Sequence, residues 1–141
     1  MKITPPDMLC FALYSAAHAM QQAYTPLLEP LGLTYPQYLA MTALWGEDEQ
    51  TVGALGKVLH LESNTLTPLI KRLEAQGLVE RVRDAEDERR VLVRLTDKGR
   101  AMQSQAAHVP TCILEATGLD VPKAIDLRKR VTALRDRVKA S

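Results

Sequence analysis

The change of periodicity between residues 63 and 96 constrains the fold more than any other feature of this sequence. Residues 63–77 (SNTLTPLIKRLEAQG) place apolar side chains at helical spacing and end in glycine, a common helix stop. The segments LVERVR (78–83) and RVLVRLT (90–96) instead alternate apolar and polar residues, or run apolar, on either side of the polar turn DAEDER. The sequence therefore predicts a helix that leads directly into a β-hairpin.

Three further helices are expected before this pair. Apolar residues recur at helical spacing from residue 9 to residue 28, after Asp7, whose side chain we expect to cap the helix. Residues 34–46 form a second helix, capped by Thr34, and residues 51–61 form a short third one. The order helix, helix, short helix, turn, helix and hairpin is the plan of a winged helix-turn-helix domain.

The segments on either side of this plan carry apolar helical stripes with no place in a minimal winged domain. Thr96 can cap a helix that runs to residue 116 with a bend at Pro110, and Asp120 can cap a last helix that reaches residue 140. Packing against a second copy of the chain would bury these stripes, which favours a homodimer.

The fold class is therefore mainly α (α+β), a winged helix-turn-helix with N- and C-terminal dimerisation helices. We expect one domain over residues 1–141, in which residues 34–99 form the DNA-binding region. Residues 1–33 and 100–141 supply the dimerisation helices.

Composition and the distribution of residue types limit which broad class of protein this chain can belong to. The chain has 141 residues, 46% of them apolar, which is enough for one globular core. No apolar run approaches the ~20 residues of a membrane span, and the N-terminus lacks the regions of a secretory signal, so we expect a cytoplasmic protein without membrane contact. His18, His60 and His108 are scattered, so neither a metal site nor a cofactor is expected.

A winged helix-turn-helix inserts its second helix into the major groove, which makes the start of the helix at 63–77 informative. Short side chains there let the backbone approach base edges, and two basic residues further along can reach phosphates. Helix capping by Ser63 or Asn64 and a solvated basic pair are the alternative interpretation. The candidate DNA-binding residues on this helix are Ser63, Asn64, Thr65, Thr67, Pro68, Lys71 and Arg72.

The hairpin loop has mixed charge, with Asp87 and Glu88 beside Arg89 and Arg90. Arg89, aimed by Asp87, can enter the minor groove, where the charge of an arginine meets a focused negative potential. The alternative is a surface ion pair worth less than about 1 kcal/mol. Arg89 and Arg90 complete the candidate DNA-binding set.

The stretch SNTLTPLIKRLEAQGLVERVRDAEDERRVLVRLTDKG resembles the MarR-type dimeric winged-helix regulators, and the resemblance extends over nearly the whole chain. LCFALY at residues 9–14 and TYPQYLA at 34–40 resemble the organic-hydroperoxide-sensing, OhrR-like repressors of that family. The resemblance implies a transcriptional repressor, not an enzyme, that binds a pseudo-palindromic operator in double-stranded DNA and takes an organic hydroperoxide as inducer. Glu62 and Asn64 depart from the aspartate and glycine of better-known relatives, so no operator sequence is implied.

Cys10 lies in the first turn of the predicted helix, where unpaired backbone N–H groups favour an anion such as a thiolate. Tyr24 lies fourteen residues further along, about 21 Å at 1.5 Å per residue, so it cannot touch Cys10 of its own chain. The resemblance implies that Tyr24 and Tyr35 hydrogen-bond the Cys10 thiolate across the dimer interface. A packing role is the alternative, and it is our interpretation for Tyr14 and Tyr38.

In the two-cysteine branch of these sensors a distal cysteine resolves the oxidised thiol, and Cys112 in HVPTCIL matches that position. The resemblance therefore implies an intersubunit disulfide between Cys10 and Cys112 that releases the operator. A mixed disulfide with a small thiol is the alternative final state. The bland alternative for Cys112 is a buried cysteine in the dimer core.

Three rival functions remain. A small aromatic or phenolic ligand could release a MarR-type repressor without thiol chemistry, in which case Cys10 is packing. A thiol peroxidase would share the first chemical step but would leave the winged domain without a purpose. An architectural DNA-binding protein would need no sensor.

Overall fold

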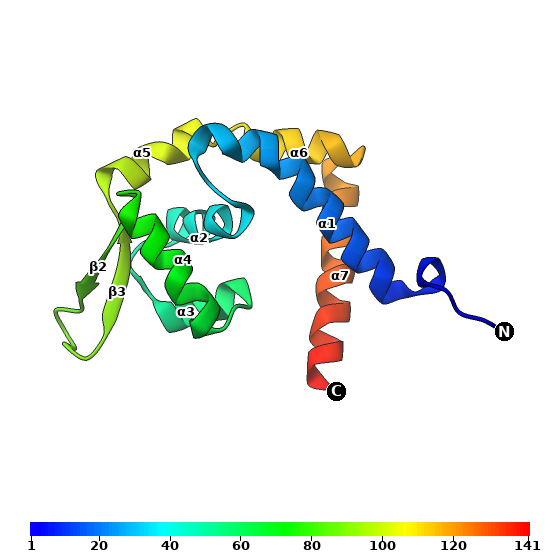
Figure 1. The fold of residues 1–141 in the computed structure, drawn as a ribbon, viewed down its shortest axis with the longest axis horizontal. Helices are drawn as coiled ribbons and strands as arrows, with labels where there is room; N and C mark the ends of the chain where they lie inside the picture. Colours follow the sequence, from blue (N-terminus) through cyan, green and yellow to red (C-terminus); the bar gives the residue numbers. More distant parts are fainter. The chain divides into compact units, whose positions relative to one another are not determined.

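The computed structural model describes residues 1–141 and contains seven α-helices, two short 3₁₀-helices and three strands (Figure 1). Residues 1–107 and residues 108–141 form two compact units, which are described separately. In the first unit the helices are α1 (Leu9–Leu28), α2 (Tyr35–Gly46), α3 (Val52–Leu59), α4 (Ser63–Ala75) and α5 (Asp97–Gln105), and the strands are β1 (Gln50–Thr51), β2 (Val79–Arg83) and β3 (Val91–Leu95). The second unit contains α6 (Val109–Thr117) and α7 (Val121–Ala140).

Threonine side chains start three of the helices, which places the elements of the winged domain. The Thr34 hydroxyl accepts from the backbone N–H of Gln37, whose side chain in turn accepts from the N–H of Thr34, so a capping box starts α2. Thr51 starts α3 and Thr96 starts α5 in the same way, each accepting from an N–H three residues further on. The predicted caps at Thr34 and Thr96 are confirmed.

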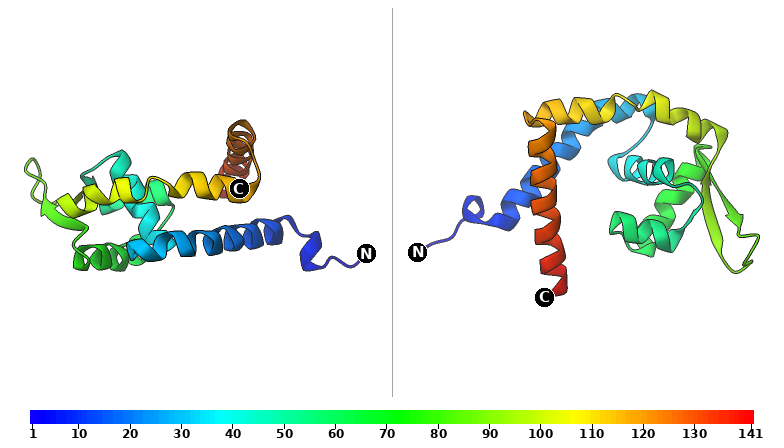
Figure 2. Two further views of the ribbon diagram at one scale, coloured as in Figure 1. Left: turned by 90° about the horizontal axis from the view of Figure 1, so that it is seen from above. Right: turned by 180° about the vertical axis from the view of Figure 1, so that it is seen from behind.

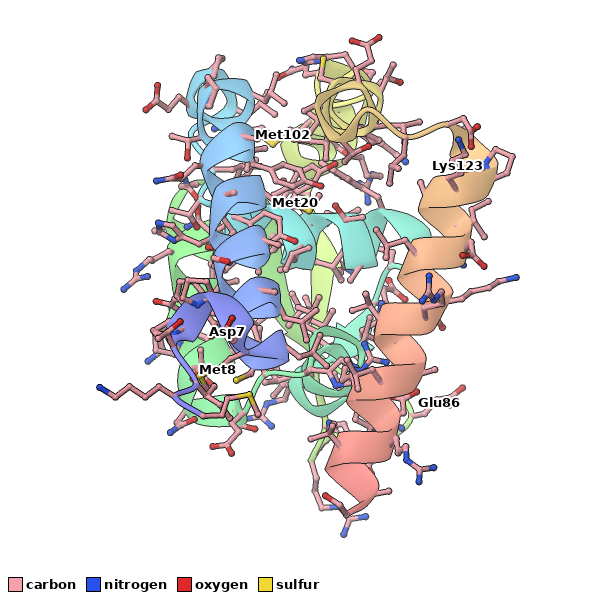
Figure 3. All side chains as sticks on the ribbon, turned by 90° about the vertical axis from the view of Figure 1, so that its right-hand side faces the viewer. Asp7, Met8, Met20, Glu86, Met102 and Lys123 are labelled. Carbon is pink, nitrogen blue, oxygen red and sulfur yellow. The ribbon has the colours of Figure 1, made fainter.

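The predicted cap at Asp7 is wrong. Residues Pro5–Asp7 form a 3₁₀ turn, and the Asp7 carboxylate accepts hydrogen bonds from the backbone N–H (3.0 Å) and hydroxyl (2.9 Å) of Thr4. These bonds hold the pKa of Asp7 below its ordinary value. Helix α1 begins after Met8, which lacks a capping side chain, and Figure 3 labels Asp7 and Met8 in the turn that leads into it.

The core of the first unit lies between α2, α3, α4 and the hairpin. The buried face of α4 packs against α2 and α3, and the contact between α4 and β2 brings the hairpin onto the same core. Its largest fully buried side chains are Leu28, Met41, Leu44, Leu55, Leu66, Ile70, Leu73, Leu78, Val79 and Val93. This core presents the opposite face of α4 to solvent.

The predicted hairpin is confirmed. Strands β2 and β3 pair antiparallel from Val79 opposite Leu95 to Arg83 opposite Val91, and β3 also pairs with the two-residue strand β1, which the sequence did not indicate. Figure 1 shows the hairpin leaving the C-terminal end of α4 and projecting away from the helices as a wing. The winged helix-turn-helix plan predicted for this region is present.

The helix expected at residues 97–116 is two helices. Helix α5 ends at Gln105, and α6 begins at Val109 with Pro110 in its first turn, where the missing N–H costs no hydrogen bond. A left-handed glycine, Gly118, ends α6, and Asp120 caps α7 by accepting from the N–H of Lys123, as predicted. Helices α6 and α7 therefore meet at a sharp turn (Figure 2). None of the helices combines the length and apolar character needed to cross a bilayer.

Candidate functional site

Helix α4 presents a polar face to solvent. Its buried side chains are Leu66, Leu69, Ile70 and Leu73, which recur at helical spacing on one side. The predicted DNA-binding residues lie on the other side: Ser63, Asn64, Thr65, Pro68, Lys71 and Arg72 are exposed and Thr67 is half-buried. The structure thus brings the predicted residues of this helix together on one accessible surface.

Glu62, rather than Ser63 or Asn64, occupies the cap position of α4. The Glu62 carbonyl accepts from the backbone N–H groups of Thr65 (3.0 Å) and Leu66 (2.9 Å), but its side chain makes no capping bond. Ser63 and Asn64 are the first two residues of the helix itself. The side chains of these two residues are therefore not spent on capping, contrary to the alternative interpretation.

The loop of the wing holds Arg89 outward by a network within the loop. The Asp87 carboxylate accepts from the backbone N–H (3.1 Å) and from Nε (3.2 Å) of Arg89, and these bonds hold the pKa of Asp87 below its ordinary value. The guanidinium of Arg83 donates to the carbonyl of Glu88 at 2.7 Å, and Arg90 lies 3.8 Å from Asp84. The Arg89 side chain is 91% exposed, so the loop is braced while the arginine stays accessible.

Cys10 is a free, exposed thiol in the first turn of α1. Its neighbours Leu9 and Phe11 are 63% and 41% exposed, and α1 contains no Asp, Glu, Lys or Arg between its bounds. In both views of Figure 2 the N-terminal part of α1 extends clear of α2–α4. The thiol therefore lies on an apolar helical surface that the first unit itself leaves uncovered.

Three of the four tyrosines form one cluster. The ring centroids of Tyr24 and Tyr35 are 4.7 Å apart, and those of Tyr24 and Tyr38 are 5.6 Å apart. Burial raises the pKa of Tyr24 to about 12, to which the neighbouring Tyr35 and Tyr38 contribute, and burial raises the pKa of Tyr35 and Tyr38 as well. These hydroxyls therefore stay protonated near neutral pH and can donate hydrogen bonds.

The remaining aromatic residues separate into structural and peripheral positions. Tyr38 is buried and lies 6.3 Å from Trp45, whose indole N–H donates to the carbonyl of Gly99 at 2.9 Å. Tyr14 is 72% exposed and contacts Phe11 instead of the cluster. Within one chain α1 is continuous from Leu9 to Leu28, so Cys10 and Tyr24 are separated along it by roughly 21 Å, as the helical rise predicts.

Cys112 lies in α6 of the second unit, half-buried, and its thiol is free like that of Cys10. The structure has no group of three or more His, Cys, Asp or Glu side chains placed to hold a metal ion.

A groove that the sequence does not indicate lies between α1 and the start of α2. It has a volume of about 490 Å³ and exposes both amide and aromatic groups. Its lining includes His18, Gln21, Gln22, Thr25, Tyr35 and Pro36. No short motif marks it, because its residues come from a helix and from the segment that returns after the turn at Gly32.

Comparison with known proteins gives consistent matches. Residues 22–105 match the family model described as transcriptional regulator SarA/Rot. The organic hydroperoxide resistance transcriptional regulator of Bacillus subtilis is 44% identical over 128 residues, which cover 91% of this chain and 85% of that protein. Both the family and this relative are described as transcriptional regulators, not as enzymes.

Two solved structures of AbfR of Staphylococcus epidermidis resemble the chain along most of its length. Reduced AbfR bound to DNA is 34% identical with a TM-score of 0.80, covering 94% of this chain and 90% of that one. Disulfide-formed AbfR is 35% identical with a TM-score of 0.63, covering 94% and 88%.

Proposed function

The chain belongs to the MarR-like family of winged-helix transcriptional regulators, and we propose that it is a DNA-binding repressor that senses organic hydroperoxides through Cys10. The observation that carries the proposal is the Cys10 thiol itself, which is free and exposed in the first turn of an uncharged helix. The 44% identity to an organic hydroperoxide resistance regulator supports the same assignment.

The sensing step is a two-electron oxidation of the thiolate. The Cys10 sulfur attacks the terminal oxygen of the hydroperoxide, the O–O bond breaks, and the alkoxide leaves and takes up a proton to become an alcohol. Cys10 becomes a sulfenic acid. The apolar side chains around it, Leu9, Phe11 and Leu13, favour an alkyl hydroperoxide over hydrogen peroxide because they bury its carbon chain.

Tyr24 and Tyr35 support the thiolate from the other subunit of a homodimer. Their rings are 4.7 Å apart, and the pKa of Tyr24, raised to about 12, keeps its hydroxyl protonated. Two O–H donors directed at one sulfur stabilise its anionic form. Dimerisation through residues 1–33 and 100–141 brings the pair to Cys10, since its own α1 holds Tyr24 too far away.

Cys112 resolves the sulfenic acid. Its thiolate attacks the Cys10 sulfur of the opposite subunit, an S–S bond forms, and the sulfenic oxygen leaves as water after taking up a proton. The disulfide requires Cα atoms within about 7 Å, so its formation constrains how the two chains pack. That AbfR exists in a disulfide-formed state supports this assignment by analogy.

The DNA interface consists of α4 and the wing. Ser63, Asn64, Thr65, Thr67 and Pro68 face base edges in the major groove, and Lys71, Arg72 and Arg90 contact phosphates. Arg89, braced by Asp87, enters the minor groove. Two such units in a dimer read a pseudo-palindromic operator, and reduced AbfR bound to DNA supports this arrangement.

The test oxidises reduced protein with one equivalent of tert-butyl hydroperoxide per thiol and follows both disulfide formation and DNA release. We expect a covalent dimer on a non-reducing gel that is absent in Cys10→Ser and in Cys112→Ser. A duplex selected by the reduced protein from a random library should dissociate on oxidation of the wild type and stay bound to Cys10→Ser. Release from Cys10→Ser, or no mass change at Cys10 in the wild type, would overturn the proposal.

The groove between α1 and α2 supports a second candidate function, a repressor released by a small aromatic ligand. Its lining combines the Tyr35 ring with the amides of Gln21 and Gln22, groups suited to a planar molecule with polar substituents. In that case salicylate should release DNA equally from the wild type and from Cys10→Ser, and peroxide should release it from neither.

A further inference from the structure

The connection between α4 and the wing is fixed at its first step by backbone hydrogen bonds. Gly77, with φ of 75°, ends α4; its N–H donates to the carbonyl of Glu74 (2.9 Å), and the N–H of Leu78 donates to that of Leu73 (3.0 Å). These two bonds form a Schellman turn. The turn sets where β2 begins but leaves the direction of the strand beyond it to other contacts.

One side chain supplies such a contact. Glu74, in the last turn of α4, accepts through Oε2 from the backbone N–H of Arg81 (3.2 Å) and through Oε1 from the guanidinium of Arg81 (3.2 Å). β2 is an edge strand, because the sheet order is β1-β3-β2, and an outward N–H on an edge strand has no ladder partner. Glu74 satisfies that N–H and holds the strand to the helix at one point.

The contact of Glu74 with Arg81, called the clamp below, lies where a small tilt of β2 moves the wing loop by a large distance. The wing loop begins three residues beyond Arg81, about 10 Å along an extended strand, so a tilt of about 10° moves the loop by roughly 2 Å. A site in which two elements must engage together tolerates about 0.5 Å. Arg89 therefore depends on the direction of β2 for its reach relative to α4.

The pair contributes little to stability. Both side chains are more than a third exposed, at 39% for Arg81 and 35% for Glu74, and solvent screens such a pair. Glu74 also places a negative charge on α4, the helix proposed to face DNA. A carboxylate that adds little stability and opposes DNA electrostatically is explained by what it positions.

We propose that Glu74 is a positioning residue for DNA recognition, which orients the wing so that Arg89 reaches the minor groove while α4 occupies the major groove. The inference rests on the DNA-binding function proposed above. In this proposal Glu74 does not contact DNA, and it affects DNA binding only through the position of Arg89.

The test is a double-mutant cycle between Glu74 and Arg89, measured with a duplex that the reduced wild-type protein selects from a random library. We expect Glu74→Ala to weaken binding about five- to tenfold when Arg89 is present and less than twofold in an Arg89→Ala background, because the wing contact is already lost there. The dependence of binding on salt should fall in Glu74→Ala by about as much as in Arg89→Ala. Glu74→Gln, which keeps an acceptor for the Arg81 N–H, should recover part of the loss.

Glu80→Ala is the matched control. Glu80 is the residue before Arg81 on the same strand and pairs with Arg94 across the hairpin at 2.7 Å, so its removal deletes the same charge without touching the clamp. We expect no loss of affinity in this variant. Equal losses in Glu80→Ala and Glu74→Ala, or equal effects of Glu74→Ala with and without Arg89, would overturn the inference.

Two further readings keep the outcomes distinct. If Glu74→Ala lowers the thermal unfolding midpoint by several degrees, the cycle is decided by Glu74→Gln, whose loss must still vanish in the Arg89→Ala background. Failure of the wild type to select any duplex would instead refute the DNA-binding function on which the inference rests.

Discussion

Of the glycines in this chain, Gly99 is the one at which the fold leaves the least room for a side chain. A Cβ built on it would lie 2.0 Å from the carbonyl oxygen of Leu78 and 3.1 Å from the carbonyl carbon, both backbone atoms that cannot rotate away. We expect Gly99→Ala to lower the free energy of unfolding by about 1–3 kcal/mol, because the start of α5 must move away from Leu78, the residue before β2. Urea unfolding followed by circular dichroism measures the change.

Gly46→Ala is the control for that substitution. Gly46 is the last residue of α2, and a Cβ there meets nothing within 4 Å. Its replacement should leave stability unchanged or raise it by about 0.4–1 kcal/mol, since alanine restricts the unfolded chain. A Gly99→Ala protein as stable as Gly46→Ala would contradict the close approach of α5 to Leu78.

Tyr24 makes stability depend on alkaline pH. Its pKa is about 12 in the folded chain against an ordinary value of 10.0, so the folded state disfavours the phenolate. The contribution of the Tyr24 hydroxyl to the free energy of unfolding is fully present below pH 10. It is lost as pH rises through 12, because this hydroxyl ionises at lower pH in the unfolded state than in the folded state. Urea midpoints should fall between pH 10 and 12 in the wild type and fall less steeply in Tyr24→Phe. Parallel curves for the two proteins would contradict this assignment.

Helix α4 carries a proline that weakens it. Pro68 lies inside the helix and has no N–H to donate to the carbonyl of Asn64 four residues earlier. Pro68→Ala restores that bond, while the more flexible unfolded chain offsets about 0.4–1 kcal/mol of the gain. An interior proline costs roughly 3 kcal/mol, so after this offset we expect a net gain of about 2 kcal/mol in urea unfolding. A net loss would indicate that the helix is already distorted around Pro68.

An apolar stripe on α7 indicates how the chain associates. Ala124, Leu127, Val131, Leu134 and Val138 follow one another at alternate spacings of three and four residues, and none of them is buried. We expect Val131→Glu to convert the dimer into a monomer in sedimentation equilibrium and to weaken operator binding, because both half-sites can no longer be engaged together. Ala133→Glu places the same charge on α7 off this stripe and should leave the dimer intact; dissociation in both variants would argue against the stripe as the interface.

Local patterns were sufficient for the winged plan and insufficient for the site. The alternation in VERVR and VLVRL and the threonines before three helices are short-range signals, so the hairpin and most helix starts could be predicted. The predicted cap at Asp7 is wrong because its carboxylate accepts from Thr4, three residues earlier, instead of from the N–H groups at the start of α1. The sequence does not indicate which of these two partners the carboxylate takes. The contact between the rings of Tyr24 and Tyr35 and the clamp between Glu74 and Arg81 depend on how the chain turns at Gly32 and Gly77, which hydrophobic periodicity does not indicate.

Trp45 makes the protein its own optical reporter. It is the single tryptophan of the chain, 6.3 Å from Tyr38 and hydrogen-bonded to the start of α5. At that separation, excitation energy absorbed by the tyrosine cluster is transferred to the indole by resonance energy transfer. The fluorescence of Trp45 therefore reports both on the tyrosines and on the start of α5. A rearrangement at either end changes the intensity or wavelength of that emission, so the proposed response to a peroxide can be followed in real time on unlabelled protein.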